Sequence, residues 1–235
     1  MQDMRDLARD RRAILKNAAV LTAVLAVPSA VAASGRMLTQ RDLRPVAEPP
    51  VPPAPPIAPP VQTSSRVVRP DLLRQALASL DRHRGRIARH DRIAIADMDA
   101  PSSQPRFHIV DLRGGESTSF LVAHGSGSDP AHTGFLKRFS NEFGSNATSQ
   151  GAFVTADYYV GKHGSSQRLI GLDESNCNAL GRNIVVHSAW YANRNMIDEH
   201  GMLGRSQGCF AVGERDLDKV FALLGTGRMI YAAKV

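Results

Sequence analysis

Two stretches of the chain decide its fold and its chemistry: Asn183-Ile184-Val185-Val186-His187-Ser188 and Gly204-Arg205-Ser206-Gln207-Gly208-Cys209. The first stretch has the apolar, β-branched composition of a buried strand and ends in a polar pair. In the second stretch, a glycine directly before the cysteine allows the backbone to bend sharply. The pattern predicts a histidine held rigidly at a strand end and a cysteine on a tight turn.

A cysteine and a histidine that meet in one pocket are the pair that nucleophilic acyl transfer needs. A thiol is mostly protonated at neutral pH, and a nearby imidazole raises the fraction of reactive thiolate. We therefore interpret Cys209 as the candidate nucleophile and His187 as its base. The backbone N–H groups of Gln207, Gly208 and Cys209 are candidates to stabilise an oxyanion, a contribution of roughly 3–4 kcal/mol per donor.

Most of the remaining chain after residue 91 is predicted to be β-structure. Short alternating or apolar runs predict strands over 92–97, 107–112, 117–123, 152–160, 167–172, 183–187 and 228–233. Only residues 214–224 have a clear helical period, and residues 190–205 are expected to form a long loop. The fold class is therefore mainly β with one or two short helices.

The first 70 residues are predicted to be an export signal and a linker. Residues 1–32 combine a basic head, which contains Arg11 and Arg12, with a short apolar middle and a small-residue cleavage site. The paired arginines favour the twin-arginine type of signal; an ordinary signal and an uncleaved anchor are the alternatives. Residues 33–70 form a basic linker, in which nine prolines between positions 45 and 60 favour an extended spacer.

Residues 71–90 are predicted to hold an amphipathic helix over 71–84, which serves as a lid on the following domain or as part of its edge. Asp71 is expected to cap the N-terminus of this helix. Its apolar face is expected to consist of Leu73, Ala76, Leu77 and Leu80. The compact domain is then residues 91–235.

The formal net charge of +7 is concentrated outside the compact domain. Residues 1–32 have a net charge of +2 and residues 33–90 one of +6, whereas residues 91–235 have −1. This distribution argues against nucleic-acid binding, which needs positive charge on the folded face. The basic linker suits an anionic polymer of the cell envelope, a membrane surface, or no partner at all. No apolar run reaches the ~20 residues of a transmembrane helix, so no span is expected in the mature chain.

The pair His187-Ser188, followed by Ser206-Gln207-Gly208-Cys209, resembles the signature of the cysteine L,D-transpeptidases that cross-link bacterial peptidoglycan. The resemblance is closest to the murein L,D-transpeptidase catalytic-domain family and covers residues 92–235. Its other parts are 122–125, 161–164, 182–188 and 204–212. It implies a β-sandwich or barrel of the L,D-transpeptidase type, an exported location in the periplasm or cell wall, and no metal or organic cofactor.

The resemblance also implies a mechanism on peptidoglycan stem peptides. Cys209 would attack the amide between the diamino acid and D-alanine, and His187 would carry the proton to the leaving amine. The backbone carbonyl of Ser188 would orient the histidine. An amine that accepts the acyl group gives a cross-link between two stems, and water gives an L,D-carboxypeptidase.

The sequence departs from the family pattern at two places. Gln207 replaces the usual histidine, and Phe210-Ala211 replaces the usual Ile/Val followed by Arg/Asn. Only the backbone of residue 207 is needed for an oxyanion, so the first departure is compatible with activity. The second removes the usual substrate contact. The candidate substrate-binding residues are Arg205, Ser206, Trp190, Tyr191, His124 and Arg182.

Other interpretations of the same residues stay open at this point. Cys209 is compatible with a structural disulfide to Cys177, and His187 with a buried histidine satisfied by the backbone. Among the other histidines, His124 is a candidate for the pocket or its surroundings, and the rest, His163 among them, are expected at the surface. The alternative functions are a peptidoglycan cysteine hydrolase, a zinc hydrolase, and a non-catalytic domain that binds the cell wall.

Overall fold

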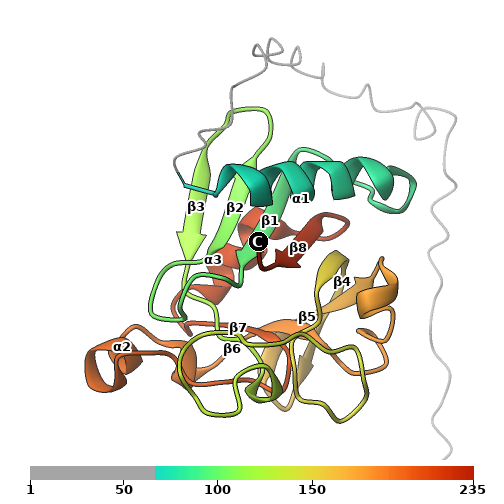
Figure 1. Ribbon diagram of the computed structural model, residues 1–235. Coiled ribbons are helices and arrows are strands. Elements are labelled where there is room, and N and C mark those ends of the chain that lie inside the picture. Colours follow the sequence, from blue (N-terminus) through green and yellow to red (C-terminus); the bar gives the residue numbers. More distant parts are fainter. Residues whose placement is uncertain (1–66) are drawn as a thin grey trace, which may run out of the picture. The chain divides into compact units, whose positions relative to one another are not determined.

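The computed structural model describes residues 67–235, and Figure 1 shows how their elements are arranged. The predicted export signal at 1–32 and most of the predicted linker at 33–70 lie outside the described residues. The helices in residues 67–235 are α1 (Pro70–Arg82), α2 (Asn195–His200) and α3 (Leu217–Leu224). The strands are β1 (Arg92–Asp97), β2 (Phe107–Asp111), β3 (Ser117–Phe120), β4 (Gly151–Gly161), β5 (Gly164–Gly171), β6 (Val185–Ser188), β7 (Phe210–Val212) and β8 (Met229–Ala233).

The eight strands form one mixed sheet in the order β3-β2-β1-β8-β4-β5-β6-β7. β1 to β3 form the expected antiparallel meander, whereas β1 pairs in parallel with β8 and β6 pairs in parallel with β7. The Ala123 N–H, just after β3, donates to the Ala211 carbonyl on β7 at 2.8 Å. This contact joins the chain after one edge strand to the other edge strand, so the sheet curls back on itself. The predicted mainly β class is confirmed.

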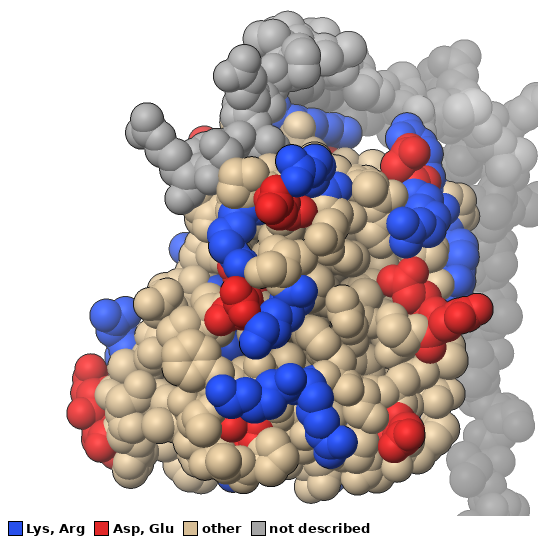
Figure 2. All heavy atoms as spheres, viewed as in Figure 1, with Lys and Arg blue, Asp and Glu red and all other residues tan. Residues whose placement is uncertain are grey.

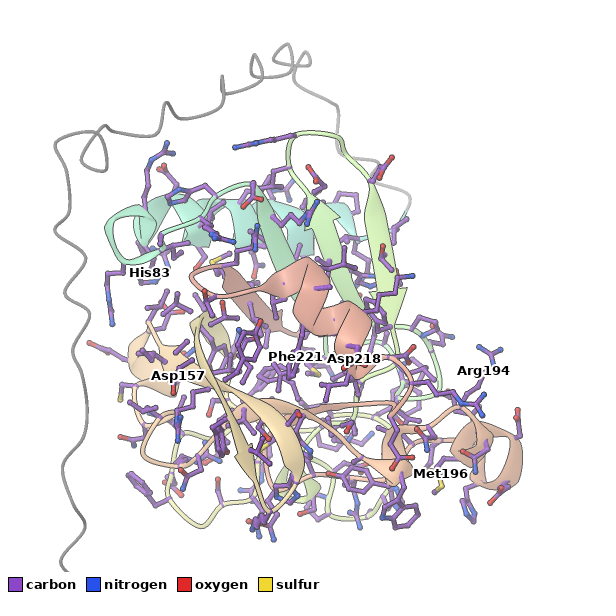
Figure 3. The ribbon with its side chains drawn as sticks, turned by 180° about the vertical axis from the view of Figure 1, so that it is seen from behind. His83, Asp157, Arg194, Met196, Asp218 and Phe221 are labelled. Atoms are coloured by element: carbon purple, nitrogen blue, oxygen red, sulfur yellow. The ribbon has the colours of Figure 1, made fainter. Side chains whose placement is uncertain are left out.

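Helices α1 and α3 cover opposite faces of the sheet centre (Figures 1 and 3). On β1, Ile93 and Ile95 belong to the apolar cluster that contains α1, whereas Ala94 and Ala96 belong to the cluster that contains α3. Successive side chains of a strand point to opposite faces, so one strand supplies both cores. Figure 3 shows α3 lying over the sheet, with Phe221 directed back toward it.

Helix α1 begins earlier than the sequence analysis predicts. Arg69 is the residue before the helix, Pro70 takes its first position and Asp71 lies in its first turn, so Asp71 is not the cap. Proline is favoured at this position because its fixed φ suits a helix and it needs no hydrogen-bond acceptor there. The predicted apolar face is also shifted: Leu72 is fully buried, whereas Leu77 is 36% exposed. The helix packs on a sheet face rather than over the cavity described below.

The structure agrees with the predicted strands to within a few residues, and it contains two elements that were not predicted. β7 has three residues, too few for an alternating pattern to be detected. α2 lies inside the predicted loop 190–205 and ends at Gly201, which has a φ of +74°. A left-handed residue at this position closes a helix, and glycine adopts it without a steric penalty.

Charges of both signs lie close together on the face of the domain shown in Figure 2. Several are paired, such as Arg92 with Asp111 at 3.1 Å and Arg69 with Asp99 at 3.0 Å. This interspersed pattern fits the small net charge of residues 91–235. No helix of the described residues is long and apolar enough to cross a membrane.

Candidate active site

The parallel pair β6–β7 brings the candidate histidine and cysteine to one face of the sheet. Val186 pairs with Phe210 and His187 with Ala211, so Cys209 follows the same register opposite Val185. The Phe210 ring is fully buried against the rings of Phe107 and Phe153, with centroids 6.3 and 5.5 Å away. This aromatic packing fixes the start of β7 and therefore the position of Cys209.

Cys209 and His187 line a single cavity of about 660 Å³. Its walls come from the turn before β7, from β6, from the tip of the β4–β5 hairpin and from the segment 143–146. The predicted residues that line it are Cys209, His187, Gln207, Ser206, Arg205, Arg182 and Tyr191. Most of the candidate site therefore comes together as the sequence analysis expects.

The hydrogen bond of His187 determines which of its nitrogens is free. Nδ1 lies 2.8 Å from the carbonyl oxygen of Ser188, which can only accept, so Nδ1 donates. In the neutral ring Nε2 then has no proton and is the nitrogen that can act as a base. Burial lowers the pKa of His187, and the nearby His163 and Lys162 lower it further. The imidazole is therefore neutral at neutral pH.

Cys209 is 8% exposed, and its Sγ donates to the Asn183 carbonyl at 3.5 Å. Within residues 67–235 no hydrogen bond joins Sγ to His187. Burial raises the pKa of the thiol, while the Val185 N–H and the cation of Arg182 act in the opposite direction. The structure therefore describes a resting thiol in which sulfur and imidazole share a cavity without yet sharing a proton.

The turn before Cys209 is held by the side chain of Ser206. Its Oγ accepts from the Gly208 N–H at 3.1 Å and donates to the Cys209 carbonyl at 2.7 Å. The Gly208 N–H, one of the predicted oxyanion donors, is thus bonded to a side chain within the turn. Within the described residues, the N–H groups of Gln207 and Cys209 donate to no protein atom. These two groups remain as candidate donors.

Gly208 cannot be replaced without strain. Its φ is +112°, and a Cβ at this position would lie 2.7 Å from the Ala147 carbonyl oxygen. Both features need a residue without a side chain. The close approach of Ala147 packs the segment before β4 directly against the turn that carries Cys209.

Arg182 fixes the same segment from the other side. Its guanidinium donates to Ser140 O, Ser149 Oγ, Ser145 Oγ and Ala147 O at 2.6–3.1 Å. These four bonds use both terminal nitrogens, so the residue is a clamp rather than the free substrate contact that the sequence analysis expects. Its positive charge still lowers the pKa of the Cys209 thiol.

Four predicted residues do not line the cavity: Gly208, described above, and Trp190, Ser188 and His124. Trp190 is 65% exposed beside Tyr191, so it is not a buried wall of the groove. Ser188 contributes only its carbonyl oxygen, the contact that the family resemblance implies. His124 is fully enclosed, and its Nδ1 accepts from Arg106 at 2.7 Å. Its carbonyl accepts the Ser206 N–H at 2.9 Å, so His124 supports the turn from behind.

Buried charges surround His124. Burial and the Arg106 cation lower the pKa of His124 to about 4, so the ring is neutral at ordinary pH. Its Nε2 lies 3.5 Å from Asp129 Oδ2. Arg205 donates to the backbone carbonyls of Asp129 at 2.5 Å and Pro130 at 3.1 Å, which ties the start of the turn before Cys209 to the same cluster.

The sequence analysis did not name Lys162 and His163 as site residues, although both line the cavity. They form the tip of the β4–β5 hairpin, and His163 stacks on His187 with ring centroids 4.6 Å apart and an interplanar angle of 27°. His163 is exposed as expected, but it also contacts the candidate base, which was not predicted. The available signal was the Gly161-Lys162-His163-Gly164 turn between two strand-like runs. Its position over His187 depends on how the hairpin curves, which the sequence does not specify.

Cys177 and Cys209 are both free, one exposed and the other buried, so the alternative of a disulfide between them is not realised in this structure. Residues 67–235 contain no cluster of three metal-ligating side chains.

Comparison with known proteins identifies the family. A sequence model described as the L,D-transpeptidase catalytic domain matches residues 64–233. No curated protein matches the chain. Similar solved structures include an L,D-transpeptidase from Mycobacterium smegmatis (14% identity, TM-score 0.37, 61% of this chain and 58% of that one). Another is L,D-transpeptidase 3 from Mycobacterium tuberculosis, with 14% identity and a TM-score of 0.39 over 61% of each chain. A third is the L,D-transpeptidase from Xylanimonas cellulosilytica, with 15% identity and a TM-score of 0.35 over 68% of this chain and 69% of that one.

The match spans about six tenths of the length of the first of these structures. The sequence match, in contrast, covers well over half of the present chain and includes α1, the complete sheet and both candidate catalytic residues. The chain therefore belongs to the L,D-transpeptidase catalytic-domain family.

Proposed function

We propose that the protein is a peptidoglycan L,D-transpeptidase of the cell envelope, with Cys209 as its nucleophile. The observation that supports this most directly is the shared cavity of Cys209 and His187. Gln207 lines the same cavity, and its N–H and that of Cys209 donate to no described protein atom. A thiol, a base and backbone donors are the three parts that acyl transfer through a thioester requires.

The reaction starts with the amide between the diamino acid and D-alanine of a stem peptide. As the substrate enters, the Cys209 side chain turns from the Asn183 carbonyl toward His187, and Nε2 accepts the thiol proton. The sulfur attacks the carbonyl carbon, and the oxyanion that forms accepts from the N–H groups of Gln207 and Cys209. His187 returns the proton to the nitrogen of D-alanine, which leaves, and an acyl thioester remains on Cys209.

An amine of a second stem peptide then attacks the thioester. His187 accepts a proton from this amine, the new amide forms, and Cys209 leaves as a thiol with that proton. The result is a cross-link between two stems. Water in place of the amine gives a carboxylic acid, so the same site acts as an L,D-carboxypeptidase when no acceptor is bound.

The charges around the cavity suit this sequence of steps. The thiol stays protonated at rest because burial raises its pKa, which protects it from unproductive reactions. Once the thiolate forms, the Val185 N–H and the cations of Arg182 and Lys162 stabilise it. His187 stays neutral and available as a base because burial lowers its pKa.

The direct test is mass spectrometry of tetrapeptide peptidoglycan fragments after incubation with the full chain. We expect loss of D-alanine together with cross-linked or trimmed products. Cys209→Ala should give neither, and the matched variant Cys177→Ala should behave like the unsubstituted protein, since Cys177 is exposed and outside the cavity. Turnover by Cys209→Ala would refute the cysteine mechanism. Inert fragments with every variant would favour the alternative of a non-catalytic wall-binding domain.

A carbapenem, whose strained amide imitates the acyl donor, provides a second test. The intact mass of the protein should rise by the mass of the drug, and Cys209→Ala should abolish the adduct. An unchanged mass of the unsubstituted protein would count against the proposal.

We propose further that residues 1–32 direct export by the twin-arginine route and are removed after Ala32. The experiment compares the unsubstituted chain with the double variant Arg11→Lys, Arg12→Lys in cell fractions. The double variant should stay in the cytoplasm uncleaved, and the N-terminus of the exported protein should be Ala33. Normal export of the double variant would exclude the twin-arginine route.

The basic linker 33–70 is proposed to bind an anionic polymer of the envelope. Retention of the full chain on an immobilised polyanion should weaken as salt is raised. Absence of retention at low salt would leave the linker as a spacer only.

A further inference from the structure

The tip of the β4–β5 hairpin places a second imidazole on the candidate base. The rings of His163 and His187 have centroids 4.6 Å apart and an interplanar angle of 27°, which is a stacked arrangement. His187 is 1% exposed, whereas His163 is exposed to solvent. His163 therefore covers one face of a buried ring and keeps its own outer face in water.

Several contacts hold the tip in this position. Ser166, the residue of β5 that pairs with His187, donates its Oγ to the Gly164 carbonyl at 3.1 Å. The residue beside His187 in the sheet is thus tied to the tip that lies over it. Gly164 has a φ of +74°, the left-handed conformation that the turn of a tight hairpin requires. No atom lies within 4 Å of the place that its Cβ would take.

The stem of the hairpin is braced as well. The Arg168 guanidinium lies over the Tyr159 ring, 4.0 Å from its centroid, and Arg168 also pairs with Asp157 at 2.5 Å. The Tyr158 ring stacks edge-on against Phe221 of α3, with centroids 4.9 Å apart. The register of the β4–β5 pair shifts between Thr155 and Tyr158, and such a bulge bends a hairpin. The two strands of the stem are therefore braced against each other, and β4 is also anchored to α3.

We propose that His163 is a positioning residue for His187, because its ring excludes water from one imidazole face and holds the ring plane while Ser188 holds Nδ1. This inference rests on the proposed role of His187 as the base. Two independent contacts then fix the imidazole: the hydrogen bond to the Ser188 carbonyl within the ring plane and the stack on one ring face. Together they leave Nε2 as the nitrogen available to the cavity that contains Cys209.

The proposal predicts the electrostatic state of His187. Several groups share its surroundings. They are Lys162 and His163 from the hairpin tip, Cys209 and Arg205 from the turn before β7, Arg182 from the segment before β6, and Tyr191. Burial is the largest cause that lowers the pKa of His187, and His163 and Lys162 add to it. Removal of the covering ring should therefore raise this pKa.

The test titrates His187 by NMR in the full chain with ¹⁵N-labelled histidine, its signals being assigned from a His187→Asn variant. Three variants are compared: His163→Ala removes the cover, His163→Phe keeps an aromatic cover without a titrating group, and Val160→Ala changes an 82% exposed residue of the same hairpin as a control. His163→Ala should raise the pKa of His187 and mix its two neutral tautomers. His163→Phe should keep the single tautomer, and Val160→Ala should match the unsubstituted protein.

Acylation of Cys209 by a carbapenem provides the kinetic readout. Aromatic stacking of this kind changes an equilibrium by a factor of about 2 to 10, so His163→Ala should slow acylation about threefold to tenfold. The acid limb of its pH profile should also move to higher pH. His163→Phe should restore the rate to within about twofold, which a purely structural effect of losing the histidine would not predict.

The outcomes separate this inference from the proposed function. An unchanged tautomer and pKa of His187 in His163→Ala would overturn the positioning role, as would a His163→Phe variant that behaves like His163→Ala. If the NMR results are as expected but no variant reacts with the carbapenem, the positioning role stands and the transpeptidase proposal fails.

Discussion

Replacement of Gly208 by alanine tests whether the turn at Cys209 depends on a close backbone approach. Two effects act in Gly208→Ala: a φ of +112°, which L-residues rarely adopt, and a Cβ only 2.7 Å from the Ala147 carbonyl oxygen. A residue with a side chain that is held at such a φ costs about 1–3 kcal/mol of backbone strain. Forcing an additional carbon into a packed position costs about 1–3 kcal/mol more. We therefore expect a loss of about 3–4 kcal/mol in the free energy of unfolding.

Gly201→Ala is the matched control, because Gly201 also has a positive φ, +74°, but nothing lies within 4 Å of its Cβ position. It should lose only about 1–2 kcal/mol, the cost of a left-handed residue with a side chain. Urea unfolding of both variants gives the difference directly. In thermal unfolding Gly208→Ala should lower the Tm by about 6–16 °C.

The functional readout is the rate at which iodoacetamide alkylates Cys209, measured in a Cys177→Ser background so that only one thiol reacts. Gly208→Ala should change this rate and Gly201→Ala should not, since only the first residue adjoins Cys209. Equal stability losses in the two variants would refute the reasoning, because the contact with Ala147 would then contribute nothing beyond the backbone conformation.

Three further predictions concern the core and the base. Phe210→Ala removes a fully buried ring and should cost about 3–5 kcal/mol in urea unfolding; a loss below about 1 kcal/mol would contradict the packing described for β7. Arg106→Met leaves the Val122 carbonyl and His124 Nδ1 without their buried donor. It should lower the urea midpoint and raise the pKa of His124, and an unchanged histidine titration would contradict this. In the proposed mechanism His187 must be neutral to accept the thiol proton, and burial lowers its pKa. Release of D-alanine should therefore persist below the pH at which an exposed histidine becomes protonated. An acid limb above that pH would exclude His187 as the base.

The sequence predicts the strands of this domain well because their patterns are local. Arg92–Asp97 and Phe107–Asp111 agree with the predicted runs within one residue, since alternation and β-branched residues are visible over five or six positions. The pairing of β1 with β8 was not predicted. Parallel pairing between distant segments leaves no signal in either segment alone, and neither does a three-residue strand such as β7.

The same difference between local patterns and long-range contacts applies to the candidate site. Cys209 and His187 could be proposed as a pair, and found in one cavity, because glycine, strand end and spacing are readable from the residues themselves. The hydrogen bonds of Arg182 were not predicted because its four acceptors come from residues 140–149, which only the fold brings next to it. His163 was missed for the same reason: a hairpin tip shows its turn in the sequence but not the surface that it contacts.

The central place of β8 in the sheet has a consequence for synthesis. β8 lies between β1 and β4, and Ile93 pairs with Met229. A nascent chain that has not yet released residues 229–233 from the ribosome therefore lacks the strand that joins β1 to β4, and the facing edges of these two strands stay unpaired. Such edges invite aggregation, and long-range pairing of this kind is slow to form. We expect that a stop codon before position 229 yields insoluble protein, although Cys209 and His187 are both present.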